Sequence, residues 1–186
     1  MNALVLSLPD FLNFGFLPFL ASALLSFGSF CYPPSPMDWL EFFDLVVPGF
    51  AACAEFGFFL FVRPNIRRLP DRHSIEAEQR FLRTFNRVMP ILTGLSVILL
   101  LIYAFRFKEN NIANQTVWGA VFCFSAAGAS SIWLNQPLEQ EIAGWNPEQL
   151  PADWKSVRNR WTIAQGLRAS LQLLGFILFC VSIATR

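Results

Sequence analysis

Residues 46–70 read VVPGFAACAEFGFFLFVRPNIRRLP, and this stretch decides what kind of fold the chain can adopt. It begins as an apolar run of membrane-spanning length that contains one carboxylate, Glu55. At Arg63 and Pro64 the run gives way to a cluster of arginines. A charge at that depth in a bilayer costs about 2.5–3.5 kcal/mol on insertion scales. We therefore expect Glu55 to have either a charged partner or a chemical task.

The composition favours an integral membrane protein and excludes several kinds of site. Of the 186 residues, 54% are hydrophobic, 15% are charged and 21 are phenylalanine. The net charge of +1 gives no electrostatic reason to expect a nucleic-acid partner. The single histidine, His73, argues against haem, copper or di-iron centres that need several imidazoles. No cofactor is predicted, although a carboxylate-only metal site stays open.

Five apolar runs alternate with polar links, which predicts an all-α, polytopic membrane helix bundle. The runs cover Phe11–Cys31, Leu45–Val62, Val88–Phe105, Thr116–Leu134 and Trp161–Ile183. The last four form the expected core, a four-helix domain over residues 41–186. Residues 1–40 are expected to add an N-terminal hydrophobic segment that either spans the membrane or lies at its interface.

Basic residues collect in the two long links of this core. The link over residues 63–87 holds seven of the fourteen Lys and Arg residues, and the link over residues 135–161 holds three more. The positive-inside rule then predicts that both links are cytoplasmic, in a bacterial inner or plasma membrane, with lipid as the surrounding partner. Ser74 is expected to cap the helix that leads into the third run, and Trp145 and Trp154 are expected to anchor the second link at the interface.

Polar residues of three runs are predicted to lie at a similar depth. Glu55 lies seven residues before Val62, or roughly 10 Å below that end of its helix. Asn135 ends the fourth run on the same side. The last run carries a polar stripe at helical spacing, formed by Trp161, Gln165, Arg168 and Gln172.

Two roles for Glu55 follow from this convergence. If it meets Arg168, the two charges relieve each other's desolvation cost and form a clamp between helices without chemistry. If it faces an apolar pocket instead, it can act as an acid or a base on the wall of a functional cavity. The sequence leaves both roles open.

Four segments resemble the DUF1772 membrane family, also called the anthrone oxygenase-like family. They are AEFGFFLFVRPNIRRLP (54–70), RFLRTFNRVMP (80–90), LNQPLEQEI (134–142) and DWKSVRNRWTIAQGLR (153–168). The resemblance covers roughly residues 48–183. Where the family commonly has asparagine two residues after the proline of its Asn-x-Pro motif, this chain has Glu139.

The resemblance implies an oxygenase that converts anthrones to anthraquinones with dioxygen and no cofactor. In such a site Glu55 would be the base, and Arg168 and Asn135 would stabilise the oxyanion. Trp161 would form a wall against the aromatic rings, with Gln165 beside it as a second substrate contact. The expected ligand is a lipophilic aromatic molecule that enters from the bilayer.

A second reading of the same residues needs no chemistry. The chain would be a small scaffold or an accessory subunit of a membrane complex, and Glu55 and Arg168 would fix helix packing. An oligomer or a complex partner fits either reading. A transporter is a weaker third possibility, because the sequence has no internal repeat.

Overall fold

The computed structural model of the chain describes residues 39–106 and 112–185. Described residues are almost entirely helical and contain no strand, so the predicted all-α bundle is confirmed. The expected N-terminal segment lies outside the described residues, apart from residues 39 and 40 at the start of the first described helix.

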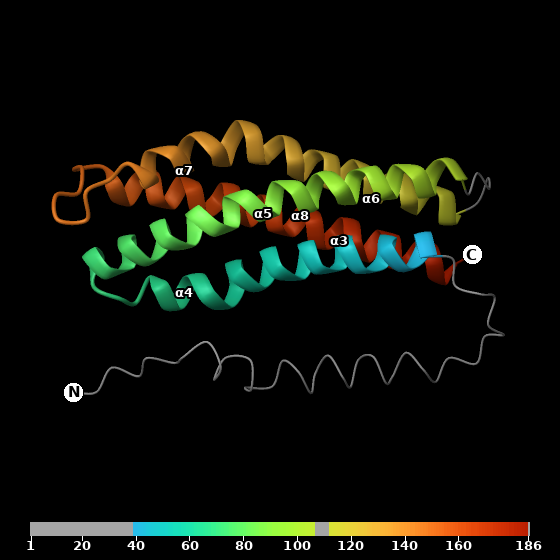
Figure 1. Cartoon of the computed structure of the whole chain (residues 1–186), viewed down its shortest axis with the longest axis horizontal. Coiled ribbons are helices and arrows are strands. Elements are labelled where there is room, and N and C mark those ends of the chain that lie inside the picture. Colours follow the sequence, from blue (N-terminus) through green and yellow to red (C-terminus); the bar gives the residue numbers. More distant parts are fainter. Residues whose placement is uncertain (1–38, 107–111, 186) are drawn as a thin grey trace. The chain divides into compact units, whose positions relative to one another are not determined.

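Four long helical rods make up this part of the chain (Figure 1). The first joins α3 (Trp39–Gly57), a π-helical turn η1 (Phe58–Val62) and α4 (Arg63–Ile66). The second is α5 (Asp71–Arg106). The third joins α6 (Ile112–Ser130), a second π-helical turn η2 (Ser131–Asn135) and α7 (Gln136–Ala143). The fourth is α8 (Trp154–Ala184).

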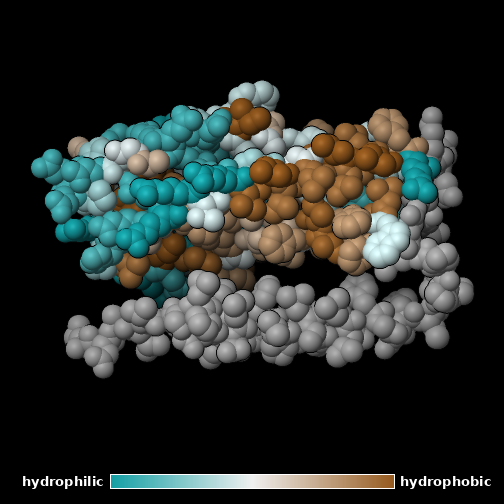
Figure 2. All heavy atoms as spheres, viewed as in Figure 1, coloured by the Kyte–Doolittle hydropathy of each residue, from teal (hydrophilic) through white to brown (hydrophobic). Residues whose placement is uncertain are grey.

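All four rods are long and apolar enough to cross a membrane, as the sequence predicted. They contain 28, 36, 32 and 31 residues, which corresponds to roughly 42–54 Å of helix. A hydrocarbon core is about 30 Å thick, so each rod is longer than a membrane requires. The surplus gathers at one end, where Figure 2 shows mostly hydrophilic residues beside a hydrophobic region. This end holds α4, α7 and the start of α5 (Figure 1).

Each rod packs against two others in a closed ring. Helix α8 contacts α6 and α3, and α5 contacts α3 and α6. Two apolar clusters fill the interior. The first contains Ala52, Leu100, Tyr103, Ala104, Val117, Ala120, Val121, Phe124 and Phe179. The second, at the hydrophilic end, contains Ile75, Leu82, Leu138, Ile142, Trp145, Val157, Trp161 and Ala164. On α8 the buried residues Gln165, Arg168 and Gln172 lie between them, so a polar layer separates the two clusters.

Two expectations about the links were wrong. Helix α5 begins at Asp71, so Ser74 lies within the helix, where it is buried and accepts a hydrogen bond from Arg158. The second link is helical as far as Ala143, and Trp145 belongs to the second apolar cluster instead of anchoring at an interface. In both cases the helices continue beyond the apolar runs, and the second apolar cluster is the core of this added part of the bundle.

Candidate functional site

Glu55 and Arg168 meet in the polar layer and form an ion pair between α3 and α8. The Nη2 atom of Arg168 lies 2.9 Å from Oε1 and 3.0 Å from Oε2 of Glu55. Glu55 is 0% exposed and Arg168 is 4% exposed. Each charge is therefore removed from water, and each is the counter-ion that makes burial of the other tolerable. The structure thus brings together the two residues that the sequence placed at the same depth.

Asn135 and Ser131 belong to the third rod, on η2. Nη1 of Arg168 donates to the hydroxyl of Ser131 over 3.4 Å. Asn135 is fully buried, but its Nδ2 donates to the backbone carbonyl of Ser130, 3.4 Å away, on its own helix. Its Oδ1 atom is buried without a hydrogen-bond partner among the described residues. Ser131, to which no sequence pattern pointed, is therefore the η2 side chain that accepts a hydrogen bond from Arg168.

Trp161 and Gln165 lie beside a second buried arginine, Arg63, which the sequence predicted as part of a polar link. Arg63 is 2% exposed, and its Nη1 donates to Oε1 of Gln165 over 2.9 Å. The guanidinium carbon lies 3.9 Å from the centre of a Trp161 ring, in a cation–π contact. The same Trp161 side chain also contacts α7, because its Nε1 donates to Oε1 of Glu139 over 3.3 Å. These contacts connect α4, α8 and α7.

A π-helical turn delivers Arg63 to this position. Arg63 follows Glu55 by eight residues. In a regular α-helix the two side chains would therefore point about 80° apart around the helix axis. In η1 the backbone N–H of Arg63 donates to the carbonyl of Phe58, five residues earlier, so the turn accommodates one extra residue. Arg63 then lies where the seventh residue after Glu55 would lie in a regular helix, about 20° from Glu55 around the helix axis. Both polar groups therefore face the interior.

A proline follows each π-helical turn after one intervening residue. Pro64 and Pro137 lack an N–H group and cannot bond to the carbonyl four residues earlier. In η2 the N–H of Gln136 donates to the carbonyl of Ser131, which repeats the arrangement of η1. The side chain of Asn65 donates to the carbonyl of Phe61 over 2.8 Å and so supplies one bond near the interrupted ladder. Turns of this kind are frequent at functional sites.

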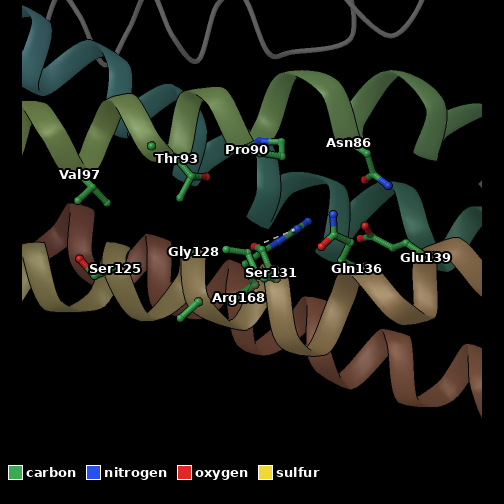
Figure 3. A pocket seen from close by; sticks show the side chains of 13 residues that line it. Asn86, Pro90, Thr93, Val97, Ser125, Gly128, Ser131, Gln136, Glu139 and Arg168 are labelled. Carbon is green, nitrogen blue, oxygen red and sulfur yellow. Dashed lines mark hydrogen bonds between the residues drawn. The ribbon is translucent and has the colours of Figure 1, made fainter.

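A pocket of about 470 Å³ lies between α5 and the third rod, next to Arg168 (Figure 3). This volume falls within the usual range for small-molecule sites. The lining is formed by Asn86, Pro90, Thr93, Gly94, Val97, Ser125, Gly128, Ala129, Ser131, Ile132, Gln136, Glu139 and Arg168. Glu55, Asn135, Trp161 and Gln165 are not among these residues. Only Arg168 of the five predicted site residues therefore lines the pocket.

Polar groups of the pocket come from all of its walls. Arg168 supplies a cation, and Glu139 supplies a carboxylate near the hydrophilic end. Thr93 accepts a hydrogen bond from Nε2 of Gln172 over 2.9 Å, which leaves its own hydroxyl hydrogen available. Pro90 cannot donate to the carbonyl of Asn86, so that carbonyl lacks its usual helical partner. An apolar cavity with a few convergent donors and acceptors is the usual form of a ligand site.

A separate buried network fastens the hydrophilic end of the bundle. Nε and Nη2 of Arg158 lie 3.0 and 2.7 Å from Oε1 of Glu78, and Nη2 also donates to Ser74. Gln79 donates to the carbonyls of Ile142 and Trp145, each over 2.9 Å. These contacts join α5 to α8 and to the end of α7, outside the pocket.

In residues 39–106 and 112–185, no three His, Cys, Asp or Glu side chains converge in a way that could hold a metal ion. The chemistry that the site itself offers is proton transfer at Glu139 and stabilisation of a negative oxygen at Arg168. Comparison with protein-family models, with curated proteins and with solved structures gives no match to this chain.

Proposed function

We propose that this protein is a membrane oxygenase that oxidises a lipophilic aromatic substrate of the anthrone type with dioxygen and without a cofactor. The observation that carries the proposal is a buried arginine, Arg168, on the wall of a largely apolar pocket of about 470 Å³. A cation in such a place stabilises an oxygen that becomes negative during a reaction. The resemblance of residues 48–183 to the anthrone oxygenase-like family supplies the reaction.

The overall reaction converts a ring CH2 group and O2 to a ring C=O group and water. A base removes one benzylic proton, and the remaining electron pair spreads onto the ring carbonyl oxygen, which becomes an enolate. The enolate carbon transfers electrons to dioxygen and forms a C–O bond, giving a peroxide. Loss of water from the peroxide breaks its O–O bond and leaves the new carbonyl. One oxygen atom ends in the quinone and the other in water.

Arg168 and Glu139 take the central roles in this proposal. Arg168 would hold the enolate oxygen, because its guanidinium lines the pocket. Glu139 would be the base, since it also lines the pocket and its Oε1 is held by the indole N–H of Trp161. Glu55 is assigned to positioning instead of proton transfer, because it is paired with Arg168 and does not line the pocket. Trp161 would then position Glu139, and not pack against the substrate.

Oxygen uptake by the purified protein in detergent, with a hydroxyanthrone as substrate, tests the proposal. The variant is Glu139→Gln, which keeps an acceptor for Trp161 but removes the base. The rate above spontaneous oxidation is expected to fall on the order of 10²–10⁴-fold, as for loss of a general base. The matched control is Glu141→Gln, an exposed carboxylate on the same helix, and it should keep the wild-type rate. Wild-type uptake no faster than the spontaneous reaction would refute the proposed activity.

The direct pairing of Glu55 with Arg168 favours one alternative. In that case the chain is a non-enzymatic scaffold or accessory subunit, and the pair fixes α3 against α8. The two proposals differ in what the pocket does: a scaffold keeps its function when the pocket is blocked. In either case we propose that the hydrophilic end of the bundle, with both long links, faces the cytoplasm of a bacterial inner or plasma membrane.

A further inference from the structure

Gly94 leaves open space at the wall of the pocket. A Cβ atom placed on Gly94 meets no neighbouring atom within 4 Å in the described chain. On the opposite wall, a Cβ on Gly128 would meet only Cγ2 of Thr93, at 3.9 Å, which is ordinary contact. Both glycines line the pocket (Figure 3 labels Gly128). Neither one is therefore required for close approach of the protein's own helices.

Other glycines of the bundle have a clear packing reason. A Cβ on Gly49 would lie 2.9 Å from the Phe176 ring, and one on Gly175 would lie 2.8 Å from the Phe124 ring. Small residues let membrane helices approach closely, and these positions follow that rule. Gly94 does not follow it, although glycine in a helix interior costs stability relative to alanine. Gly57 is equally open but lies outside the pocket, so what distinguishes Gly94 from it is its place on the pocket wall.

Gly94 lies on the face of α5 that is exposed at the outside of the bundle. Gly94 is exposed, and Ile91, Leu95 and Ile98 of the same apolar section are exposed as well. Exposed apolar residues on a membrane helix face lipid. On the third rod, Ile132 is also exposed and lines the same pocket. The pocket therefore opens between α5 and η2 toward the bilayer, with Gly94 and Ile132 on its two sides.

We propose that Gly94 is the residue that admits the ligand from the bilayer and limits its size, an inference that rests on the pocket being the ligand site of the proposed function. A flat ring system would enter edge-on past the exposed Gly94, and Arg168, which is buried and lines the same pocket, would meet its oxygen. A larger side chain at position 94 extends into this space and closes it. The proposal assigns a specificity role to a residue without any functional group.

The experiment compares Gly94→Leu with Gly57→Leu. Gly57 is a matched control, because a Cβ there also meets nothing within 4 Å and Gly57 does not line the pocket. Each protein, in detergent, is titrated with a dihydroxyanthraquinone, followed by its visible absorbance, and is then melted. Gly94→Leu is expected to bind at least tenfold more weakly than wild type while melting at the same or a higher temperature. Gly57→Leu should bind as wild type does.

Several results would overturn the proposal. One is wild-type affinity in Gly94→Leu, and another is an equal loss in Gly57→Leu. Failure of the wild-type protein to bind the quinone overturns it too. If Gly94→Leu does not fold, Gly94→Ala carries the test, with an expected weakening of several-fold. A lipid chain as the true occupant would show as loss of co-purified phospholipid from Gly94→Leu with unchanged quinone binding, which contradicts the proposal.

Oxygen uptake with the corresponding anthrone separates the two proposals. Suppose that the wild-type protein binds the quinone, that Gly94→Leu does not, and that the wild-type protein consumes no oxygen. The proposed role of Gly94 in ligand entry is then supported, and the proposed oxygenase activity is refuted. If oxygen uptake is fast in the wild-type protein and equally fast in Gly94→Leu, the oxygenase activity is supported and the proposed role of Gly94 is refuted.

Discussion

Glu55 and Arg168 are the residues on which the interior of this bundle depends most. Either charge alone would be costly in a layer that excludes water, but an ion at about 3 Å from its partner recovers much of that cost. Such a pair contributes less to stability than well-packed apolar side chains of similar size often do. Its removal is therefore informative only when single and double variants are compared.

Loss of one partner should destabilise the protein more than loss of both. In Glu55→Gln or Arg168→Leu the remaining group stays buried with fewer partners, and we expect a loss of about 3–5 kcal/mol from unfolding free energy. The double variant Glu55→Gln/Arg168→Leu should lose less than either single variant. Chemical unfolding in detergent, followed by circular dichroism, measures all three. Additive losses in the double variant would show that the two residues act independently.

At the scale of helices, the two π-helical turns determine which side chains enter the polar layer. Each is placed by a proline, Pro64 or Pro137, and each adds one residue to a rod that is otherwise regular. The first turn brings Arg63 to the interior, and Ser131, at the start of the second turn, accepts a hydrogen bond from Arg168. Beyond them, α4 and α7 continue the bundle past the apolar runs.

Gln79 should hold the end of α7 in place. Its amide group donates to two backbone carbonyls, those of Ile142 and Trp145, and alanine would leave both without this partner. We expect Gln79→Ala to lower the free energy of unfolding by about 1–3 kcal/mol. Hydrogen exchange should accelerate mainly over residues 142–153. Arg83→Ala, an exposed change one helical turn further on, serves as the control and should leave exchange in that segment unchanged.

For the whole molecule, the ring of four rods places both long links at the same end. The hydrophilic end of Figure 2 has its own apolar cluster, so the bundle continues outside the hydrocarbon region as a packed unit. The polar layer separates this cluster from the one deeper in the bundle, and the pocket lies at the level of that layer. A ligand in the pocket would thus be close to lipid on one side and to the hydrophilic end on the other.

Labelling of single cysteines should reveal this arrangement in membranes. In a variant with the four native cysteines replaced by serine, His73→Cys and Ser156→Cys should react with a membrane-impermeant maleimide from the same side. Both positions are exposed at the hydrophilic end. Ile112→Cys, at the far end of α6, should react only from the other side. Labelling of positions 73 and 156 from opposite sides would exclude the up-and-down topology.

The fold was predictable from sequence because each apolar run is long enough to span a bilayer and can satisfy its backbone only as a helix. The pairing of Glu55 with Arg168 could also be predicted as one of two possibilities, because a carboxylate and a guanidinium at the same depth in a membrane each cost less when they are paired. Spacing alone identified the polar stripe on α8, because a regular helix keeps residues 161, 165, 168 and 172 on one face.

Arg63 and the pocket depended on geometry that the sequence does not express. A π-helical turn changes the face on which every later residue lies, so regular periodicity would place Arg63 away from Glu55. Two signals were present: an arginine next to a proline, and a carboxylate, Glu139, just after a second proline. The pocket itself arises where α5 and the third rod come together. Which side chains line it depends on the relative rotation of the two rods, and only the tertiary structure decides that.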